Sequence, residues 1–201
     1  MKSATNLDLK SIASTFAPSV TNIIRMDHTH VLTTFHQYEI DSSPQTKQAL
    51  VNNACLSLEI HAQLEEEIFY PAMRAFAADS PVVSKSIPEH NEMRRLINQL
   101  RDMEPSDPAY DQTFMELMRD VLHHVADEET TLLPDAERLL GDRLGELGAQ
   151  MTKRRMELAA PRAGEIAMNT VRGMPTSTMV MAAGALLAGT YIARRAFGRH
   201  A

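Results

Sequence analysis

Cysteine and glycine are scarce in this chain of 201 residues, and their scarcity narrows the fold class. The single cysteine, Cys55, cannot form a disulfide within the chain, which excludes a secreted fold held together by such bridges. Glycine occurs eight times, whereas Ala, Leu, Met, Glu and Arg, which favour helices, are plentiful. No stretch alternates polar and apolar residues well enough to predict a strand. The chain is therefore expected to be helical.

An export signal is also missing. The N-terminal residues, MKSATNLDLKSIAST, lack the apolar core of a signal peptide, so we expect a cytoplasmic protein. Charge is missing from residues 174–193, and about 20 apolar residues suffice to span a bilayer. The strongly apolar part of this segment is shorter and rich in small residues, which also suit close helix packing. Three interpretations stay open: contact with the cytoplasmic face of a membrane, packing on the rest of the chain, and packing on a second copy of it.

Acidic and basic residues are divided unevenly along the chain, whose net charge is −6. Residues 1–150 hold 12 Lys and Arg against 24 Asp and Glu, whereas residues 151–201 hold 8 against 2. Three glycines lie close to this change, within GDRLGELGAQ. The predicted parts are an N-terminal lead-in (1–18), a helical bundle (19–140), a basic helical extension (141–173) and an apolar C-terminal helix (174–201).

Four amphipathic segments occupy the acidic part, each with apolar residues three and four positions apart. Short stretches rich in serine and proline separate them, and Ser43 and Ser80, each followed by proline, suit helix starts. This pattern favours an all-α, up-down-up-down four-helix bundle. The first helix should run from about 19 to 40. A fifth helix should cover about 142–160, followed by a looser stretch. Three prolines should kink or stop helices: Pro71, Pro88 and Pro134.

Each of the four segments carries one histidine on its apolar face: His28, His61, His90 and His124. A single histidine there is more often an ordinary core residue, and one acidic residue four positions later is a weak signal by itself. The repeat is stronger. HAQLEEEIFYP and HVADEETTLLP place a histidine, two glutamates and a proline in the same register. Glu65 and Glu128 then lie one helical turn after a histidine and on the same face.

Buried carboxylates need compensation, and a metal ion supplies it. Imidazole and carboxylate together suit iron, manganese or zinc, whereas the lack of cysteine in the set argues against a thiolate zinc site. Two carboxylates that can bridge favour two ions over one, and bundle interiors often hold carboxylate-bridged di-iron centres. The predicted metal ligands are His28, His61, Glu65, His90, His124 and Glu128, with Glu65 and Glu128 as bridges.

The four segments resemble the helix signatures of the hemerythrin-like (HHE cation-binding) family. The stretches DHTHVLTTFHQYE, HAQLEEEIFYP, EHNEMRRLINQL and HHVADEETTLLP match that family in order and spacing, over about residues 19–140. The resemblance implies the bundle fold and two non-haem iron ions. This sequence differs from the oxygen-carrying members at two positions. Arg94 stands where those proteins have a further histidine, and Glu128 takes the place of an aspartate that they have one residue later. This implies fewer nitrogen ligands and an open coordination position.

The resemblance makes binding or sensing of O₂, NO or peroxide the leading function, with that small molecule as the partner. A di-iron enzyme of peroxide removal or of iron-centre repair is the alternative. A helical interaction module with a different metal, such as zinc or manganese, is a third. Nucleic-acid binding is not expected, because the basic region lacks interleaved aromatic residues and groove-reading motifs. Assembly into a homo-oligomer stays open.

Several other polar residues have a place in this scheme. Three further histidines lie on these helices: His30 should face outward, His36 should flank the apolar face, and His123 should lie at the rim of the site or beside its ligands. Three glutamates could accept a hydrogen bond from a ligand imidazole or simply face solvent: Glu66, Glu67 and Glu129. Tyr38 could hydrogen-bond near the site or pack in the core, and Cys55 should be a buried thiol.

Overall fold

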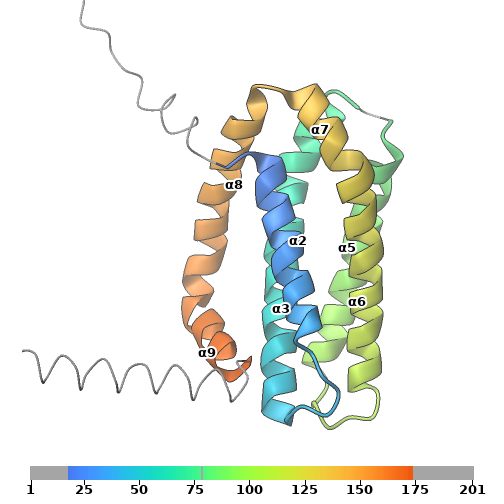
Figure 1. The fold of residues 1–201 in the computed structure, drawn as a ribbon, viewed down its shortest axis with the longest axis vertical. Helices are drawn as coiled ribbons and strands as arrows, with labels where there is room; N and C mark the ends of the chain where they lie inside the picture. Colours follow the sequence, from blue (N-terminus) through green and yellow to red (C-terminus); the bar gives the residue numbers. More distant parts are fainter. Residues whose placement is uncertain (1–17, 78, 174–201) are drawn as a thin grey trace, which may run out of the picture.

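Four antiparallel helical rods form the bundle in the computed structural model, which describes residues 18–77 and 79–173 (Figure 1). The first rod is α2 (Val20–His36) and the third is α5 (Pro81–Arg101). The second joins α3 (Pro44–Leu64), η1 (Glu65–Phe69) and α4 (Tyr70–Arg74). The fourth joins α6 (Tyr110–Asp127), η2 (Glu128–Leu132) and α7 (Leu133–Leu140). These ranges contain no strand, and the predicted all-α bundle is confirmed.

Serine caps start two of the rods, as predicted. The Ser43 side chain accepts a hydrogen bond from the Thr46 backbone N–H, with Pro44 in the first turn. Ser80 does the same for α5, with Pro81 in its first turn. The first helix is shorter than predicted, because the chain turns after His36.

Both repeated motifs contain a π-helical turn, and the rods continue past Pro71 and Pro134, so of the predicted kink or stop the stop is wrong. In η1 and η2, hydrogen bonds reach back five residues, from Tyr70 N–H to Glu65 C=O and from Leu133 N–H to Glu128 C=O. Each proline then lies in the first turn of the next α-helix, where a missing N–H costs nothing. Pro88 does not stop a helix either, since α5 continues through it.

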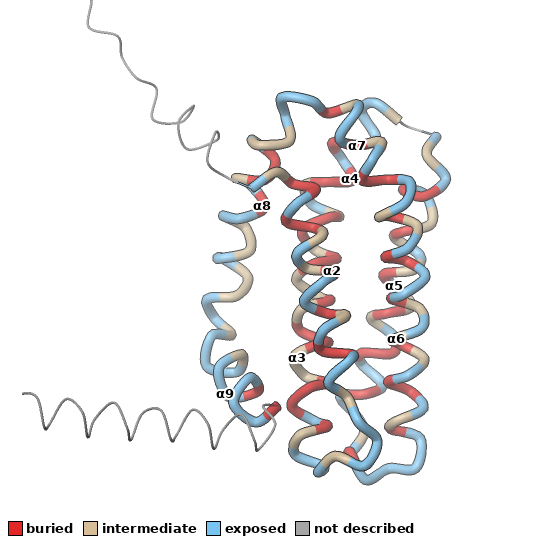
Figure 2. The backbone as a smooth tube through the Cα atoms, in the orientation of Figure 1, coloured by how far each residue is buried: buried red, intermediate tan, exposed pale blue. Residues whose placement is uncertain are grey.

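Two apolar clusters fill the bundle, one toward each end. One cluster lies around Ile24, Leu64 and Phe69, and the other around Phe35, Leu96 and Phe114. Buried residues follow the inward faces of the rods (Figure 2). The four histidines occupy the positions between these clusters along their helices. The bundle therefore encloses a polar layer between two apolar ones.

A further pair of helices, called the extension below, lies along the outer side of α2 and α3 (Figure 1). It consists of α8 (Arg143–Ala159), the short η3 (Ala160–Arg162) and α9 (Ala163–Gly173). Gly141, whose φ is 45°, makes the turn into it. The predicted fifth helix is confirmed, but the looser stretch predicted after it is wrong, because α9 packs on α3 as a helix.

Gly148 lets α8 approach the start of α2 closely. A Cβ atom at this position would lie 2.0 Å from the backbone oxygen of Pro18. Only glycine fits this crossing without a shift of the backbone. Among the residues that the structure describes, no helix is long and apolar enough to cross a membrane. The apolar segment 174–193 lies outside the described residues, and the division of the chain into four parts stays a prediction.

Candidate metal centre

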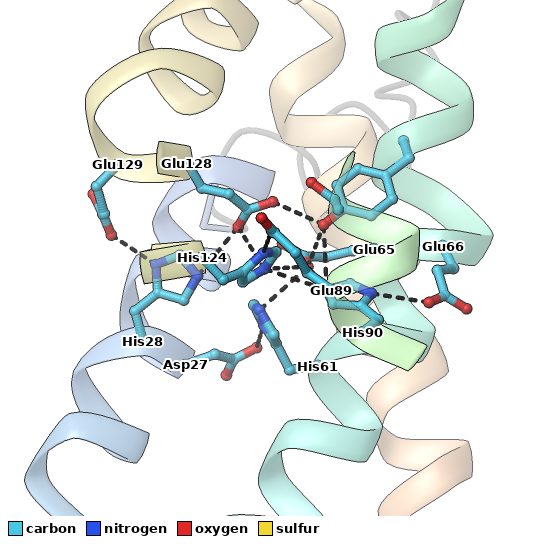
Figure 3. Close-up of polar contacts among 12 residues, drawn as sticks. Asp27, His28, His61, Glu65, Glu66, Glu89, His90, His124, Glu128 and Glu129 are labelled. Atoms are coloured by element: carbon cyan, nitrogen blue, oxygen red, sulfur yellow. Dashed lines mark hydrogen bonds and ion pairs between the residues drawn. The ribbon is translucent and has the colours of Figure 1, made fainter. Parts of the chain in front are cut away.

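The structure brings all six predicted ligand residues into one buried layer (Figure 3). Each rod contributes a histidine, and the second and fourth rods add a glutamate that begins the π-helical turn. None of the six residues is more than 4 % exposed. Their donor atoms form two groups that share Glu65, each with its atoms within 4.8 Å of one another. The groups are His28, His61, Glu65 and Glu128, and Glu65, His90 and His124.

The π-helical turns are part of this geometry. Glu65 and Glu128 each begin one, four residues after the histidine on the same rod. The separation from His61 Nε2 to Glu65 Oε2 is 3.2 Å, and from His124 Nε2 to Glu128 Oε2 it is 3.6 Å. Turns of this kind are frequent at functional sites because the extra residue changes where side chains point. The repeated motif thus encodes a local backbone change together with a pair of donors.

All four histidines direct Nε2 toward the centre of the layer. His28 Nε2 lies 3.3 Å from Glu128 Oε2, His90 Nε2 lies 3.4 Å from Glu65 Oε2, and the Nε2 atoms of His90 and His124 are 3.2 Å apart. Four buried donor atoms at this centre have no hydrogen-bond partner among the described residues: His28 Nε2, His61 Nε2, Glu65 Oε1 and Glu128 Oε2.

Buried polar atoms without partners are costly and uncommon in folded proteins. Here they belong to imidazole and carboxylate groups that converge from three of the four rods, and divalent cations would give them partners. The donor set therefore fits a metal centre.

A second set of carboxylates surrounds the histidines and contacts each Nδ1. Every one comes from a rod next to that of its histidine. The four pairs are Asp27 with His61 (3.4 Å), Glu66 with His90 (2.9 Å), Glu89 with His124 (2.9 Å) and Glu129 with His28 (2.8 Å). A carboxylate at Nδ1 keeps the proton there and leaves the Nε2 lone pair free for a metal ion. We call these four residues the outer carboxylates.

Sequence reasoning anticipated half of the outer carboxylates. Glu66 and Glu129 contact ligand imidazoles, as one of the two open interpretations had it, whereas Glu67 pairs with Arg154 instead. Asp27 and Glu89 were missed. Each directly precedes a ligand histidine, and neighbours on a helix point about 100° apart. That offset turns each carboxylate toward the histidine of an adjacent rod. The contact can be predicted only when the arrangement of the rods is known.

Each outer carboxylate also contacts a basic side chain. The four pairs are Glu129 with Arg25 (3.1 Å), Glu89 with Lys85 (3.6 Å), Glu66 with Arg94 (2.8 Å) and Asp27 with Arg155 (2.6 Å). Arg94 is the residue that replaces the additional histidine of the oxygen carriers. It points to an outer carboxylate, so it acts on the site through Glu66 and His90.

Tyr70 is a site residue that sequence reasoning missed entirely. Its hydroxyl lies 2.8 Å from Glu128 Oε1, 3.0 Å from Glu65 Oε2 and 3.4 Å from His90 Nε2. The side chain is fully buried. The second copy of the repeat has Leu133 at this position. This difference between the two copies is the feature of the sequence that could have pointed to Tyr70. Tyr70 makes the two halves of the layer different.

The charges of the layer interact strongly. Burial and the neighbouring charge of Glu128 raise the pKa of Glu65 well above its ordinary value. Burial alone would also raise the pKa of Glu128, but the close contact with His28 and the nearby histidines lower it. Burial opposes protonation of His28, yet Glu128 and Glu65 raise its pKa to about 9. Burial lowers the pKa of His61 to about 4. His61 is therefore neutral at pH 7, as a metal ligand requires.

The remaining candidates lie elsewhere. The three other helical histidines are exposed and outside the layer: His30, as predicted, His36 and His123. Tyr38 hydrogen-bonds Asp111 and packs on Phe114 near the end of the bundle, so of its two interpretations packing in the core is confirmed and a place near the site is wrong. Cys55 is buried as predicted, and burial raises the pKa of its thiol to about 12.

A helical bundle with this buried cluster of imidazoles and carboxylates defines a cation-binding protein of the hemerythrin type. The chain belongs to the hemerythrin family: the sequence model of the Hemerythrin HHE cation binding domain matches residues 19–136. Its fold is similar to the crystal structure of a Hemerythrin HHE cation binding domain-containing protein from Mycobacterium kansasii. That match has a TM-score of 0.62 and 18 % identity, and covers 78 % of this chain and 99 % of that one.

The chain is also similar to a protein named DNA nickase from Nostoc sp. (strain PCC 7120). They are 32 % identical over 114 residues, which make up 57 % of this chain and 32 % of the relative. The chain thus matches about a third of the length of that relative.

Proposed function

We propose that this protein binds or senses O₂, NO or peroxide at a non-haem di-iron centre. The observation that carries the proposal is the arrangement of two donor groups that share Glu65, with unpartnered Nε2 and carboxylate atoms directed into one buried layer. The iron ions would be held by the six predicted ligands, which stay a prediction: His28, His61, Glu65, His90, His124 and Glu128.

The distribution of donors supports the proposal of two ions and an open position. His28 and His61 belong to one group, His90 and His124 to the other, and a shared carboxylate can bridge. Bound iron would supply redox chemistry and affinity for small ligands, and two histidines per ion leave room for one. Nitrogen and oxygen donors also suit zinc, but a carboxylate-bridged pair within a helical bundle is typical of iron or manganese, and iron is the metal that the proposal takes.

The protein's own groups would select what binds. Apolar clusters lie on both sides of the polar layer, so a ligand that enters must be small. The Tyr70 hydroxyl, close to Glu65 and Glu128, is placed to donate a hydrogen bond to a bound oxygen or nitrogen atom. The outer carboxylates keep each imidazole in the tautomer that exposes Nε2.

An enzyme of peroxide removal or iron-centre repair is the second candidate, and Tyr70 is the observation that favours it. A hydroxyl beside Glu65 and Glu128 could deliver a proton to one peroxide as it is reduced to water, while a second peroxide supplies the electrons and is oxidised to O₂. Addition of peroxide to the iron-loaded protein separates the two functions. A stable charge-transfer band without turnover supports binding or sensing, whereas sustained O₂ evolution supports the enzyme. No spectral change with peroxide, O₂ or NO would overturn both.

Strand cleavage, suggested by the name of the Nostoc relative, is not the function that this geometry favours. Arg155 and Arg162 of the extension pair with Asp27 and Glu59 of the bundle. These two arginines are therefore engaged within the protein, and we expect no nucleic-acid partner. Residence in the cytoplasm and any homo-oligomer also stay predictions.

A further inference from the structure

Helix α8 of the extension reaches the metal centre through one ion pair. Arg155 Nη1 donates to Asp27 Oδ1 over 2.6 Å, and its Nη2 donates to Asp27 Oδ2. Such two-point pairing fixes the carboxylate in position as well as in charge. The same Asp27 Oδ2 faces His61 Nδ1. Arg155 thus connects the extension to a predicted metal ligand through a single residue.

Comparison with the other three outer carboxylates shows what is special about this contact. Their basic partners come from the bundle itself: Arg25 from α2, and Lys85 and Arg94 from α5. Arg155 alone among the four comes from outside residues 19–136, the part that matches the family. The fourth cation of the set is therefore supplied by the extension.

Asp27 is the least exposed of the four outer carboxylates. Its side chain is 12 % exposed, whereas the other three outer carboxylates are 26–31 % exposed. A less exposed carboxylate loses more hydration and depends more on its paired cation.

We propose that Arg155 is a positioning residue of the metal centre, which holds Asp27 against His61 and makes the extension a working part of the metal-binding unit. The inference rests on metal binding at the site, but not on the metal being iron. It goes beyond the proposed function, because it assigns a role at the centre to a helix outside the family's domain.

The structure also decides the direction of the effect. Asp27 Oδ2 lies 3.4 Å from His61 Nδ1, the longest of the four carboxylate–histidine contacts, so this carboxylate is held mainly by Arg155. A cavity of about 220 Å³ lined by both Asp27 and Arg155 lies beside the pair. Without Arg155, Asp27 has space to swing away. His61 then loses the acceptor that fixes its tautomer and ring, and metal binding weakens.

Arg155→Met in the full-length protein tests this, with Arg154→Met as the matched control. Arg154 is the adjacent residue on α8, but it pairs with Glu67 and Glu157. Both variants remove one positive charge near the site, which by electrostatics alone would tighten binding of a cation. Positioning predicts the opposite for Arg155 only. Affinities for Zn²⁺ and Fe²⁺ would be measured by competition with a chromogenic chelator, and apo stability by urea unfolding.

Arg155→Met should weaken metal binding by about 10–100-fold, the usual effect of losing an outer partner of a ligand histidine. Arg154→Met should stay within about twofold of the wild type, since exposed ion pairs contribute little. Arg155→Lys should recover part of the loss. The apo form of Arg155→Met should unfold at a lower urea concentration than that of Arg154→Met, because Asp27 loses its cation, so both affinities are measured without urea on folded protein.

Asp27→Asn provides an independent test of the same contact if Arg155→Met folds poorly. It should weaken metal binding by a similar factor, and adding Arg155→Met to it should cost little more, because both act through one contact. Equal or tighter metal binding by Arg155→Met than by Arg154→Met, or full additivity in the double variant, overturns the inference. Wild-type protein that takes only zinc overturns the proposed iron function, while the zinc affinities still test Arg155.

Discussion

Replacement of Glu65 by Gln should remove from the metal-free protein one loss of stability with rising pH, and it should weaken metal binding. Glu65 is fully buried beside Glu128, and burial together with that charge raises its pKa well above the ordinary value. The metal-free folded state therefore keeps a proton that the unfolded chain has lost. Stability conferred by this carboxyl is lost as pH rises from the unfolded pKa of about 4.5 toward the raised one.

The magnitude follows from linkage. One proton bound in the folded state but not in the unfolded state lowers the free energy of unfolding by up to about 1.4 kcal/mol per pH unit. His61 contributes the opposite slope between about pH 4 and 6.5, since burial lowers its pKa to about 4. The informative quantity is thus the difference between Glu65→Gln and wild type. The variant should gain up to about 1.4 kcal/mol on the wild type for each pH unit between about pH 5 and 6.5.

Urea unfolding in the presence of a chelator, repeated across that pH range, measures this difference. Glu67→Gln is the matched control, because Glu67 belongs to the same π-helical turn but pairs with Arg154 at the surface. Glu65→Gln should also weaken metal binding. The loss should exceed the factor of about 10–100 that is usual when a ligand histidine loses its outer hydrogen-bond partner. A difference that does not change with pH, or unchanged metal affinity, would refute the account of Glu65 as a shared buried carboxylate.

Three further substitutions have defined outcomes. Tyr70→Phe should destabilise the metal-free protein by about 1–3 kcal/mol in urea unfolding, because it removes the hydrogen bonds to two buried carboxylates; no loss would show that these bonds are not made. Gly148→Ala should lower the free energy of unfolding by about 1–3 kcal/mol, because its Cβ would meet the Pro18 backbone. Proteolysis of the extension should also become faster. Wild-type stability and proteolysis would contradict the close crossing. Ser43→Ala should cost about 1 kcal/mol through the lost cap of α3, with Ser43→Thr nearly neutral; equal losses in both would point away from capping.

Periodicity was sufficient to predict the bundle and to gather the six donors. His28, His61 and their counterparts share their helix faces with apolar residues, so any packing that buries those faces also collects the histidines. The serine caps follow from local chemistry in the same way. These features depend on neighbours within one helix, and for that reason they could be predicted.

The missed features depend on how helices are placed against one another. Asp27 and Glu89 contact histidines on adjacent rods, and Arg155 meets Asp27 across 128 positions in the chain. No local pattern encodes such rotations. The π-helical turns were missed because proline was expected to stop a helix, whereas a five-residue hydrogen bond ahead of it absorbs the disruption. Helix α9 was missed because its packing on α3 outweighs a modest sequence signal.

The most direct test of the account is the metal content of full-length protein purified without added metal. Elemental analysis against protein concentration is expected to give close to two irons per chain, since the six donors form two groups that share Glu65. One ion per chain would contradict the two-ion centre. Zinc in place of iron, or a ratio near zero, would contradict the proposed iron chemistry.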